Sequence, residues 1–594
     1  LERVVVHRAA TALYGDGPTG GVTTILTRAP APGRPRLTRS VAGEAAASRF
    51  GDGLGGRFSQ TVAGSAGAFD FTLGGTVSRV GDFYDAEGDL IPSDPHGQGG
   101  LAETTSHDLF AKLGYGVGAG RLQLMLNRFR SAQETENVSD PALNRTEPYS
   151  RKARPLFGLT GAEDQGTENT VASLDYGGAT VLGSRLHAQG FFRDYRTVFS
   201  PYDARSVPSR AVVMQSWLES ERFGGRLEVE APLAPLGGDA SVLWGADYSR
   251  EKTSQPVHVY DPAEYDRSGG MVFVKTEERV WVPVIRPTSL GLFAQLAFRP
   301  FGALQLRGGV RHERARMEVP DFVTLNGNPI RGGELRFDPT LFNLGAVVSA
   351  GDAVSLYGSF SQGFSLTDIG LALRDAPAGA TPQSPEMQAQ EVDQYEVGVR
   401  GAWRPVQTSL SAFRTSSELG TTSAGYNQPV VRAPERVYGV EATLDVQPSS
   451  AWGVGGTLSW TEGESFVARD SAWHALNSFR VQPLKATAYA RHETLPGWSN
   501  RLQVLYSGDR DRAFDDRPNP GVVGFGERPV ESYWVADYVA SVELGGRGRL
   551  DVGVQNLLNR QYFTVVSQLL RSGGNSSYTA ARGRTVSVGY TVTY

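Results

Sequence analysis

The chain has 594 residues, with 58 Lys and Arg, 63 Asp and Glu, 72 Gly and no Cys. A net charge of -5 without long runs of one sign excludes a nucleic-acid binder that needs a basic face. The lack of Cys excludes disulfides, thiolate metal sites and a cysteine nucleophile. The mean hydropathy is -0.28 and no run approaches the roughly 18 apolar residues of a membrane-spanning helix. A membrane barrel stays possible, because its strands present only alternate side chains to lipid.

The first 28 residues differ from the rest of the chain. Short apolar strands are predicted at Val4–Val6 and Val22–Leu26, and the loop between them contains glycines suited to tight turns. A phosphate-binding loop is the functional alternative, but no Gly-Lys-Ser or Gly-Lys-Thr follows the glycines. We therefore expect residues 1–28 to form a small separate fold.

From about residue 36 onward the chain repeats a pattern of alternating apolar and polar residues. The pattern is strictest in the last segment, where Val586, Val588, Tyr590, Val592 and Tyr594 share one face. It recurs in residues 304–311, 440–446 and 550–555, and it predicts strands with one face toward lipid and the other toward water. The final strand is predicted to span Arg584 to Tyr594 and to pair with the strand that starts near residue 36.

The connections between these predicted strands alternate between short and long. Short turns are predicted at Ser65–Ala68, Gly116–Ala119, Pro300–Gly302, Ala350–Asp352, Arg404–Pro405, Pro448–Trp452 and Gly545–Gly548. Long polar connections are predicted at residues 80–105, 129–167, 197–219, 251–287, 315–335, 365–390, 416–433, 464–479, 509–531 and 559–582. Together they imply about 22 strands, an even number that leaves both ends of the barrel on the side of the short turns. A lumen of that width needs a plug, and the long loops disfavour a soluble β-propeller.

Residues 1–28 closely resemble the end of the plug domain of TonB-dependent outer-membrane receptors. The matching residues are Leu1, Glu2, Arg3, Val4, Arg8, Leu13, Tyr14, Gly15, Gly20, Gly21, Val22, Ile25 and Thr27. Further segments that resemble the family are Ser361–Phe364, Gln394–Gly398, Tyr438–Glu441, Asn556–Leu558 with Tyr562, and Gly583–Arg584 with the terminal Tyr594. The chain departs from the family pattern at Ala9-Ala10, where Gly-Pro is usual, and at Thr23-Thr24, where Ile-Asn is usual.

The resemblance implies an all-β chain, an antiparallel transmembrane β-barrel of about 22 strands with the remnant of an N-terminal plug domain. Residues 1–30 are then the C-terminal end of the plug and residues 31–594 the receptor barrel. Most of the plug and the segment that contacts TonB do not match any part of the chain, so we expect a fragment of a longer receptor. A barrel that natively lacks the plug is the alternative.

By the same resemblance, the function is import of a ferric siderophore across the cell outer membrane, driven by the TonB complex through the N-terminal region. The loops are expected to be extracellular, both barrel ends periplasmic, and the receptor a monomer in contact with lipid and lipopolysaccharide. Residues 83–95 and 365–375 loosely resemble hydroxamate-siderophore receptors. Cobalamin, an oligosaccharide or haem are alternative ligands, although haem is disfavoured because Ser-Leu-Thr follows Phe364. An ungated pore or surface scaffold is the alternative if the native chain lacks the plug.

Aromatic and arginine side chains in the loops and strand ends are the candidates for ligand contact. Arginine can hold the oxygens of a chelate in bidentate fashion, and aromatic rings can cover its apolar parts. The candidates are Tyr84, Tyr149, Tyr202, Trp217, Tyr260, Trp281, Phe364, Arg374, Tyr426, Arg432 and Arg571. Anchoring at the membrane interface or packing within loops is an equal explanation for each of them.

No enzyme, cofactor or metal site is expected. The 8 His residues show no metal-ligand spacing, and no nucleophile elbow is found. The acidic loop around Asp82, Asp85, Glu87, Asp89 and Asp94 could hold Ca²⁺, but a solvated loop is favoured because the spacing does not fit an EF-hand. The alternating charges of residues 509–517 suggest a self-paired loop, with lipopolysaccharide contact as the alternative.

Overall fold

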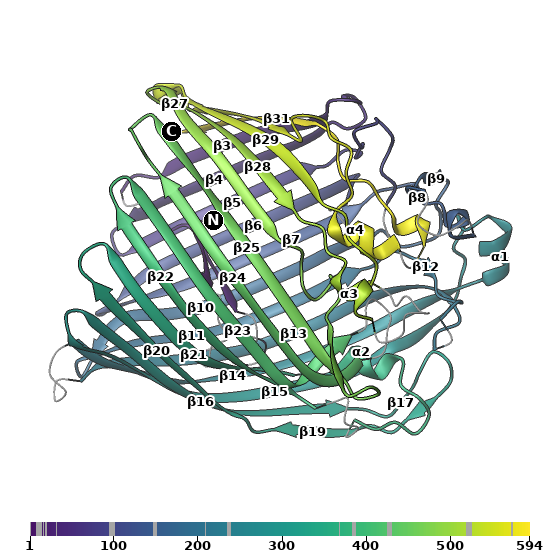
Figure 1. Cartoon of the computed structure of the whole chain (residues 1–594), viewed down its shortest axis with the longest axis horizontal. Coiled ribbons are helices and arrows are strands. Elements are labelled where there is room, and N and C mark those ends of the chain that lie inside the picture. The colour runs from purple at the N-terminus through teal and green to yellow at the C-terminus, as the bar shows by residue number, and fades with distance from the viewer. Residues whose placement is uncertain are drawn as a thin grey trace.

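The structure is a computed structural model of the chain. It describes residues 2–7, 13, 15, 17, 21–30, 33–93, 101–145, 151–207, 209–233, 239–366, 369–382, 388–423, 430–517, 526–571 and 574–594. Within these residues, 25 strands form one closed barrel (Figure 1). Three of them, β12, β19 and β26, are short extensions at strand ends, and the other 22 make an antiparallel wall. The predicted fold class is therefore confirmed.

The wall strands follow one another around the barrel in chain order. The first eleven are β3 (Arg36–Ala46), β4 (Gly55–Ala66), β5 (Phe69–Arg79), β6 (Thr104–Val117), β7 (Gly120–Gln133), β10 (Gly166–Val181), β11 (Ser184–Val198), β13 (Val213–Pro232), β14 (Asp239–Tyr260), β15 (Lys275–Phe301) and β16 (Leu304–Val319). The other eleven are β20 (Thr340–Ala350), β21 (Val354–Ser365), β22 (Gln390–Trp403), β23 (Val406–Ser423), β24 (Val430–Val446), β25 (Trp452–Val467), β27 (Lys485–Leu495), β28 (Trp498–Ser507), β29 (Tyr533–Glu543), β30 (Arg549–Gln555) and β31 (Thr585–Thr593).

The remaining elements are short. The strands are β1 (Arg3–His7), β2 (Val22–Leu26), β8 (Asn137–Ser139), β9 (Pro155–Phe157), β12 (Tyr202–Asp203), β17 (Phe322–Val323), β18 (Pro329–Ile330), β19 (Gly333–Phe337) and β26 (Ala472–Ala475). The helices are α1 (Pro262–Arg267), α2 (Ile369–Arg374), α3 (Arg512–Asp515) and α4 (Val565–Leu570). All four helices lie at the end of the barrel that carries the long loops (Figure 1). No helix among the described residues is long and apolar enough to cross a membrane.

The barrel closes between its first and last wall strands. β3 pairs with β31 in a register that places Thr38 opposite Thr593 and Ala46 opposite Thr585. The last strand was predicted one residue longer at each end, and its predicted partner near residue 36 is confirmed. The outward side chains Val588 and Tyr590 are 49% and 38% exposed, as a face toward lipid requires.

The predicted short turns all join neighbouring strands, and three further short connections, β10–β11, β13–β14 and β27–β28, were not predicted. The predicted long connection at residues 251–287 is wrong. β14 continues to Tyr260 and β15 already begins at Lys275, so most of that segment is strand. Its sequence lacks alternation because both faces of a strand above the bilayer meet water or loops, so nothing selects an apolar face there.

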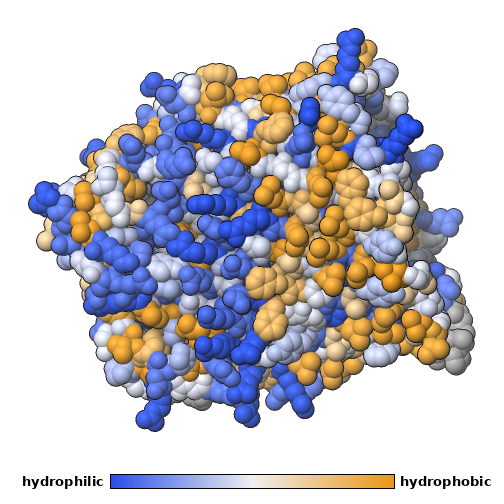
Figure 2. Space-filling model, turned by 180° about the vertical axis from the view of Figure 1, so that it is seen from behind, coloured by the Kyte–Doolittle hydropathy of each residue, from blue (hydrophilic) through white to orange (hydrophobic). Residues whose placement is uncertain are grey.

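An apolar band surrounds the wall. Its side chains alternate with the lumen-facing ones, and examples with high exposure are Phe223 (45%), Leu227 (42%), Leu292 (52%), Leu344 (62%) and Val397 (63%). Figure 2 shows apolar side chains gathered over the part of the wall away from the long loops, while polar side chains cover the part toward them. This distribution fits a wall whose part away from the long loops lies in lipid.

The N-terminal segment lies inside the barrel (Figure 1). β1 and β2 form a separate two-stranded antiparallel sheet with Val4 opposite Ile25, which confirms the two predicted strands. Lys112 of β6 donates hydrogen bonds to the carbonyl oxygens of Thr27 and Arg28 at 3.4 and 3.2 Å. These contacts attach the end of the ribbon to the lumen side of the wall.

Candidate functional site

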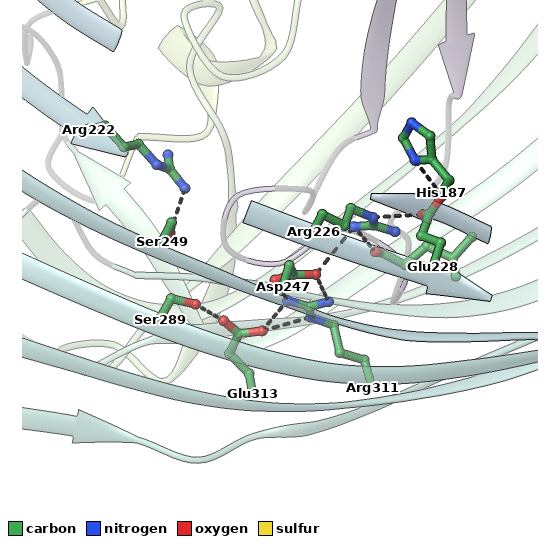
Figure 3. A network of polar contacts seen from close by, with 10 residues as sticks. His187, Arg222, Arg226, Glu228, Asp247, Ser249, Ser289, Arg311 and Glu313 are labelled. Carbon is green, nitrogen blue, oxygen red and sulfur yellow. Dashed lines mark hydrogen bonds and ion pairs between the residues drawn. The ribbon is translucent and has the colours of Figure 1, made fainter. Parts of the chain in front are cut away.

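A network of charged side chains lines the lumen on β13 to β16 (Figure 3). The guanidinium of Arg311 is fully buried and donates to both carboxylate oxygens of Asp247 at 2.6 and 2.8 Å. It also donates to Glu313 at 2.7 Å, and Arg226 reaches Asp247 at 3.3 Å. Arg226 also donates to Glu228 at 2.7 Å, so each arginine faces two carboxylates, as burial of charge requires. Arg226, Asp247, Arg311 and Glu313 form one continuous set of contacts. We call these four residues the lumen quartet.

The lumen quartet contacts the N-terminal segment. Arg226 donates a hydrogen bond to the carbonyl oxygen of Leu13 at 3.0 Å. A Cβ on Gly15 would lie 2.9 Å from the guanidinium of Arg311, so the backbone approaches the quartet closely because Gly15 has no side chain. The amide of Gly17 donates to the carbonyl oxygen of Phe364 at 3.0 Å. The wall therefore holds the segment by polar contacts that can be broken and remade.

A second polar cluster lies among the long loops, where Arg210 meets Asp375. The Arg210 side chain is fully buried and donates to Asp375 at 2.7 and 3.2 Å, while Ser209 donates to the same carboxylate at 2.7 Å. Burial opposes ionisation of Asp375, but the hydrogen bonds and charge of Arg210 outweigh it and hold the pKa of this carboxyl below its usual value. The pair is thus ionised and joins two loops.

The ring of Trp281 and the helix α2 pack around this ion pair. The ring of Trp281 lies 4.8 Å from the guanidinium carbon of Arg210 and 4.4 Å from that of Arg374. α2 packs on β15 and β16 through a buried apolar cluster of Val282, Ile285, Met317, Val319, Ile330, Leu335, Ile369, Leu373 and Ala376. Arg210, Asp375, Trp281, Arg374 and Tyr202, whose hydroxyl accepts a hydrogen bond from Arg210 at 3.4 Å, form what we call the loop cluster. It combines cations and rings at the end of the barrel that carries the long loops (Figure 1).

The structure brings together three of the residues predicted to contact a ligand, Tyr202, Trp281 and Arg374, in the loop cluster. A second group is formed by Trp217 and Tyr260 on β13 and β14, with His258 lying 4.6 and 6.4 Å from their rings. The Tyr260 hydroxyl donates to Gln215 at 2.7 Å, and burial raises the pKa of this hydroxyl. The side chains of Trp217 and Tyr260 are more than nine-tenths buried.

The other predicted residues lie apart from these groups. Phe364 is buried against Leu341 in β20, and Arg432 donates to the carbonyl oxygen of Gln388. The guanidinium of Arg571 lies over the ring of Tyr578 at 5.3 Å. Two more candidates, Tyr149 and Tyr426, lie outside the described residues.

Tyr84, the remaining candidate, packs within the acidic loop of residues 81–93. Burial and the nearby carboxylate of Asp82 raise the pKa of Tyr84 to about 12. In the same loop, the ammonium of Lys152 lies 2.5, 2.5 and 2.8 Å from carboxylates of Asp85, Glu87 and Asp89. These three acids are the group in the described chain whose oxygens could meet one metal ion, and Lys152 contacts each of them. Lys152, from the connection before β9, thus links the three carboxylates, while Glu87 and Asp89 stay 60% and 65% exposed, as the predicted solvated loop requires.

The alternating charges of residues 509–517 were predicted to pair within the run, and this is wrong for Arg510 and Arg512. Both donate to Glu462 on β25 at 3.0 Å, and Arg512 also reaches Glu464 at 2.5 Å. Asp516 within the run accepts a hydrogen bond from the amide of Ala475 at 2.7 Å, also outside the run. Strand pairing brings the β25 carboxylates close, which sequence spacing cannot show.

The closed wall of 22 strands and the lumen segment define a class of large outer-membrane barrels. The family model for the beta-barrel of TonB dependent receptor-like proteins matches residues 121–557. The chain therefore belongs to the TonB-dependent receptor family.

Known relatives align along the full chain. A ferric aerobactin receptor of Klebsiella pneumoniae is 25% identical over 638 residues, and the alignment covers 100% of this chain and 83% of that protein. A rhizobactin receptor of Rhizobium meliloti (strain 1021) is 24% identical, with 100% and 82% covered. Both names refer to receptors.

Solved structures share the fold. The copper transporter OprC superposes with a TM-score of 0.75 at 15% identity, covering 100% of this chain and 85% of that one. The siderophore receptor PiuA from Acinetobacter baumannii gives a TM-score of 0.73 at 15% identity, with 100% and 86% covered. At this identity the likeness shows the fold alone.

Sequence reasoning missed Arg193, Arg210, Arg222 and Arg226 as candidates. It looked for ligand contacts in loops, whereas three of these arginines lie on the lumen face of β11 and β13. The sequence did offer a signal. In β13, Arg222, Arg226 and Glu228 occupy one face of the strand, and the apolar Phe223 and Leu227 occupy the opposite, lipid-facing side. A charged residue on the inner face of a wide barrel is a candidate for contact with the transported molecule.

Proposed function

We propose that this protein is an outer-membrane receptor that binds a ferric siderophore at its long-loop side and imports it with energy from the TonB complex. Membership of the TonB-dependent receptor family and the names of the relatives support this proposal. The observation that carries it is the N-terminal segment held in the lumen by Lys112, Arg226 and the carbonyl of Phe364. A plug segment that the TonB complex moves during import must be held by contacts that can break, and these polar contacts meet that requirement.

Residues 1–30 act as the end of a plug domain and residues 31–594 as the receptor barrel. The long loops face the outside of the cell, and the short turns with both barrel ends face the periplasm. The receptor works as a monomer in contact with lipid and lipopolysaccharide, and performs no covalent chemistry. The even strand count and the apolar band on the side of the short turns support this orientation. The predicted ligand-contact residues act once the loops open.

Uptake of iron from defined chelates tests the proposal. A deletion strain and its parent are grown under iron limitation with ferric aerobactin as the iron source, and uptake of radioactive iron is measured. The parent should take up the iron, the deletion strain should not, and a protonophore should abolish uptake in the parent. Uptake by the parent that survives collapse of the proton gradient would contradict energised import.

A further inference from the structure

Two arginines face each other across neighbouring strands on the lumen wall. Arg193 of β11 lies directly opposite Arg222 of β13 in the strand register. Lumen-facing residues at the same level on the flanking strands are Val171 of β10 and Glu251 of β14. One carboxylate thus accompanies two cations at this level, whereas each arginine of the adjacent lumen quartet faces two carboxylates.

The single carboxylate is poorly placed to neutralise the pair. Glu251 accepts a hydrogen bond from Ser220 at 2.5 Å, and its other oxygen lies 3.9 Å from Arg222. Arg222 donates to Ser249 at 3.1 Å, and Arg193 donates to Ser220 at 3.3 Å (Figure 3 shows Arg222 and Ser249). Among the residues that the structure describes, Arg193 has no carboxylate within ion-pair distance.

Such a pair does not help the wall to fold. Like charges directly opposite in an antiparallel sheet have Cβ atoms about 5 Å apart and destabilise the pairing. The side chain of Arg222 nevertheless keeps 41% of its surface exposed to the lumen, so its terminal nitrogens can be reached. A positive pair that is unfavourable for the fold and accessible from the lumen fits a binding role.

Along the barrel axis, the arginine pair lies toward the end that carries the long loops. The outward neighbours Phe192 and Phe223 belong to the apolar band, with 39% and 45% exposure. One step toward the long loops the outward residues are Asp194 and Glu221, both exposed and opposite each other. The arginine pair thus lies at the edge of the band, between the loop cluster and the lumen quartet.

We propose that Arg193 and Arg222 form a carboxylate-binding subsite, which selects ferric chelates that carry free carboxylates and net negative charge. Two guanidinium groups side by side offer planar donors that match carboxylate oxygens in bidentate fashion. The subsite rests on the proposed function, since it names the chemical class of the imported chelate. A chelate with hydroxamates and no free carboxylate gains nothing from it.

Equilibrium binding to the purified full chain tests the subsite. The probes are ferric citrate, which carries carboxylates, ferric desferrioxamine B, which offers hydroxamates only, and ferric aerobactin. In R193Q/R222Q the Kd for ferric citrate should rise at least tenfold while that for ferric desferrioxamine B stays within twofold. R193K/R222K, which keeps the charge without the planar donors, should fall between wild type and R193Q/R222Q. Arg128→Gln, on the outward face of β7 and paired with Glu168, is the matched control and should change neither Kd.

Each other outcome has a distinct meaning. Unchanged ferric citrate binding in R193Q/R222Q, or equal weakening for both chelates, overturns the subsite. Wild-type binding of ferric desferrioxamine B without binding of ferric citrate or ferric aerobactin also overturns the subsite and leaves the proposed function standing. If wild type binds ferric aerobactin but not ferric citrate, the at least tenfold rise in Kd is expected for ferric aerobactin, which also carries free carboxylates, and its absence overturns the subsite. If the wild-type protein binds none of the three, both proposals fail. A correct barrel fold of each variant is checked by heat-modifiable migration in gel electrophoresis.

Discussion

Arg210 and Asp375, which are 165 residues apart in sequence, form a buried two-pronged ion pair that ties two long loops together. Arg210 has no exposed side-chain surface, and Asp375 follows the last residue of α2. Because removal of one partner leaves the other charge buried, the pair decides whether the loops stay closed. We therefore expect the α2 region to open when the pair breaks.

Asp375→Asn should open the α2 region. The substitution removes the carboxylate that faces the buried Arg210 charge, a loss of about 3–5 kcal/mol for a buried pair. Amide hydrogen exchange of residues 369–376 should become at least tenfold faster than in wild type. Asp266→Asn is the control, because its pair with Arg205 is more than half exposed on the carboxylate side and such pairs contribute about 0–1 kcal/mol. Equal exchange in both variants would contradict this role of the pair.

His474 should make one loop contact sensitive to pH. Burial lowers the affinity of this imidazole for a proton, but hydrogen bonds with the Asp516 backbone and the Asp470 side chain outweigh it and raise the pKa above the usual 6.5. A raised pKa in the folded state gives stability that is fully present below 6.5 and is lost as pH rises through the folded value.

Exchange of the amides around residues 472–475 and 512–516 should therefore quicken as pH rises above 6.5, after correction for the intrinsic pH dependence of exchange. His474→Gln should remove this dependence and exchange at the faster rate at every pH. A corrected exchange rate in wild type that stays constant between pH 6 and 9 would contradict the prediction that protonation of His474 stabilises this contact.

The sequence predicted the wall better than the site, for a physical reason. Alternation in segments such as residues 304–311 follows from lipid on one side and water on the other, so it is visible in one strand alone. The lumen quartet depends on the relative registers of β13 to β16, which no single segment contains. Arg311 stands on the polar face of that alternating segment, but its partner Asp247 is 64 residues away. Contacts between distant strands had to come from the structure.

Lys152 should stabilise the acidic loop by neutralising it. Burial opposes ionisation of Asp85, but hydrogen bonds from Lys152 and Gln561 outweigh it and hold the pKa of this carboxyl below its usual value. In Lys152→Ala the carboxylates of Asp85, Glu87 and Asp89 repel one another, and protease cleavage within residues 81–93 should quicken. Added Ca²⁺ should slow cleavage in the variant and leave wild type unchanged. Lys275→Ala, which removes an exposed partner of Glu278, is the control. Slower cleavage of wild type with Ca²⁺ would argue against neutralisation by Lys152.

Asp247→Asn should loosen the N-terminal segment without opening the wall. Asp247 accepts hydrogen bonds from both Arg311 and Arg226, and Arg226 in turn holds the carbonyl of Leu13. The neutral amide no longer accepts from both arginines, so Arg311 relies on Glu313 and Arg226 on Glu228, and Arg226 releases Leu13. Amide exchange of residues 2–7 and 21–28 should become at least tenfold faster, as loss of a charged hydrogen bond worth about 1.5–3 kcal/mol implies.

The control for this change is Asp239→Asn, also on β14, whose carboxylate is 84% exposed and lies 3.7 Å from Arg299. It removes the same charge from the first residue of the same strand, outside the lumen quartet, and it should leave the exchange of residues 2–28 as in wild type. Faster exchange in both variants would mean that the segment responds to the charge of the barrel as a whole. Faster exchange in Asp247→Asn alone would assign the hold on the segment to the lumen quartet, since the two variants differ only in where the carboxylate is lost.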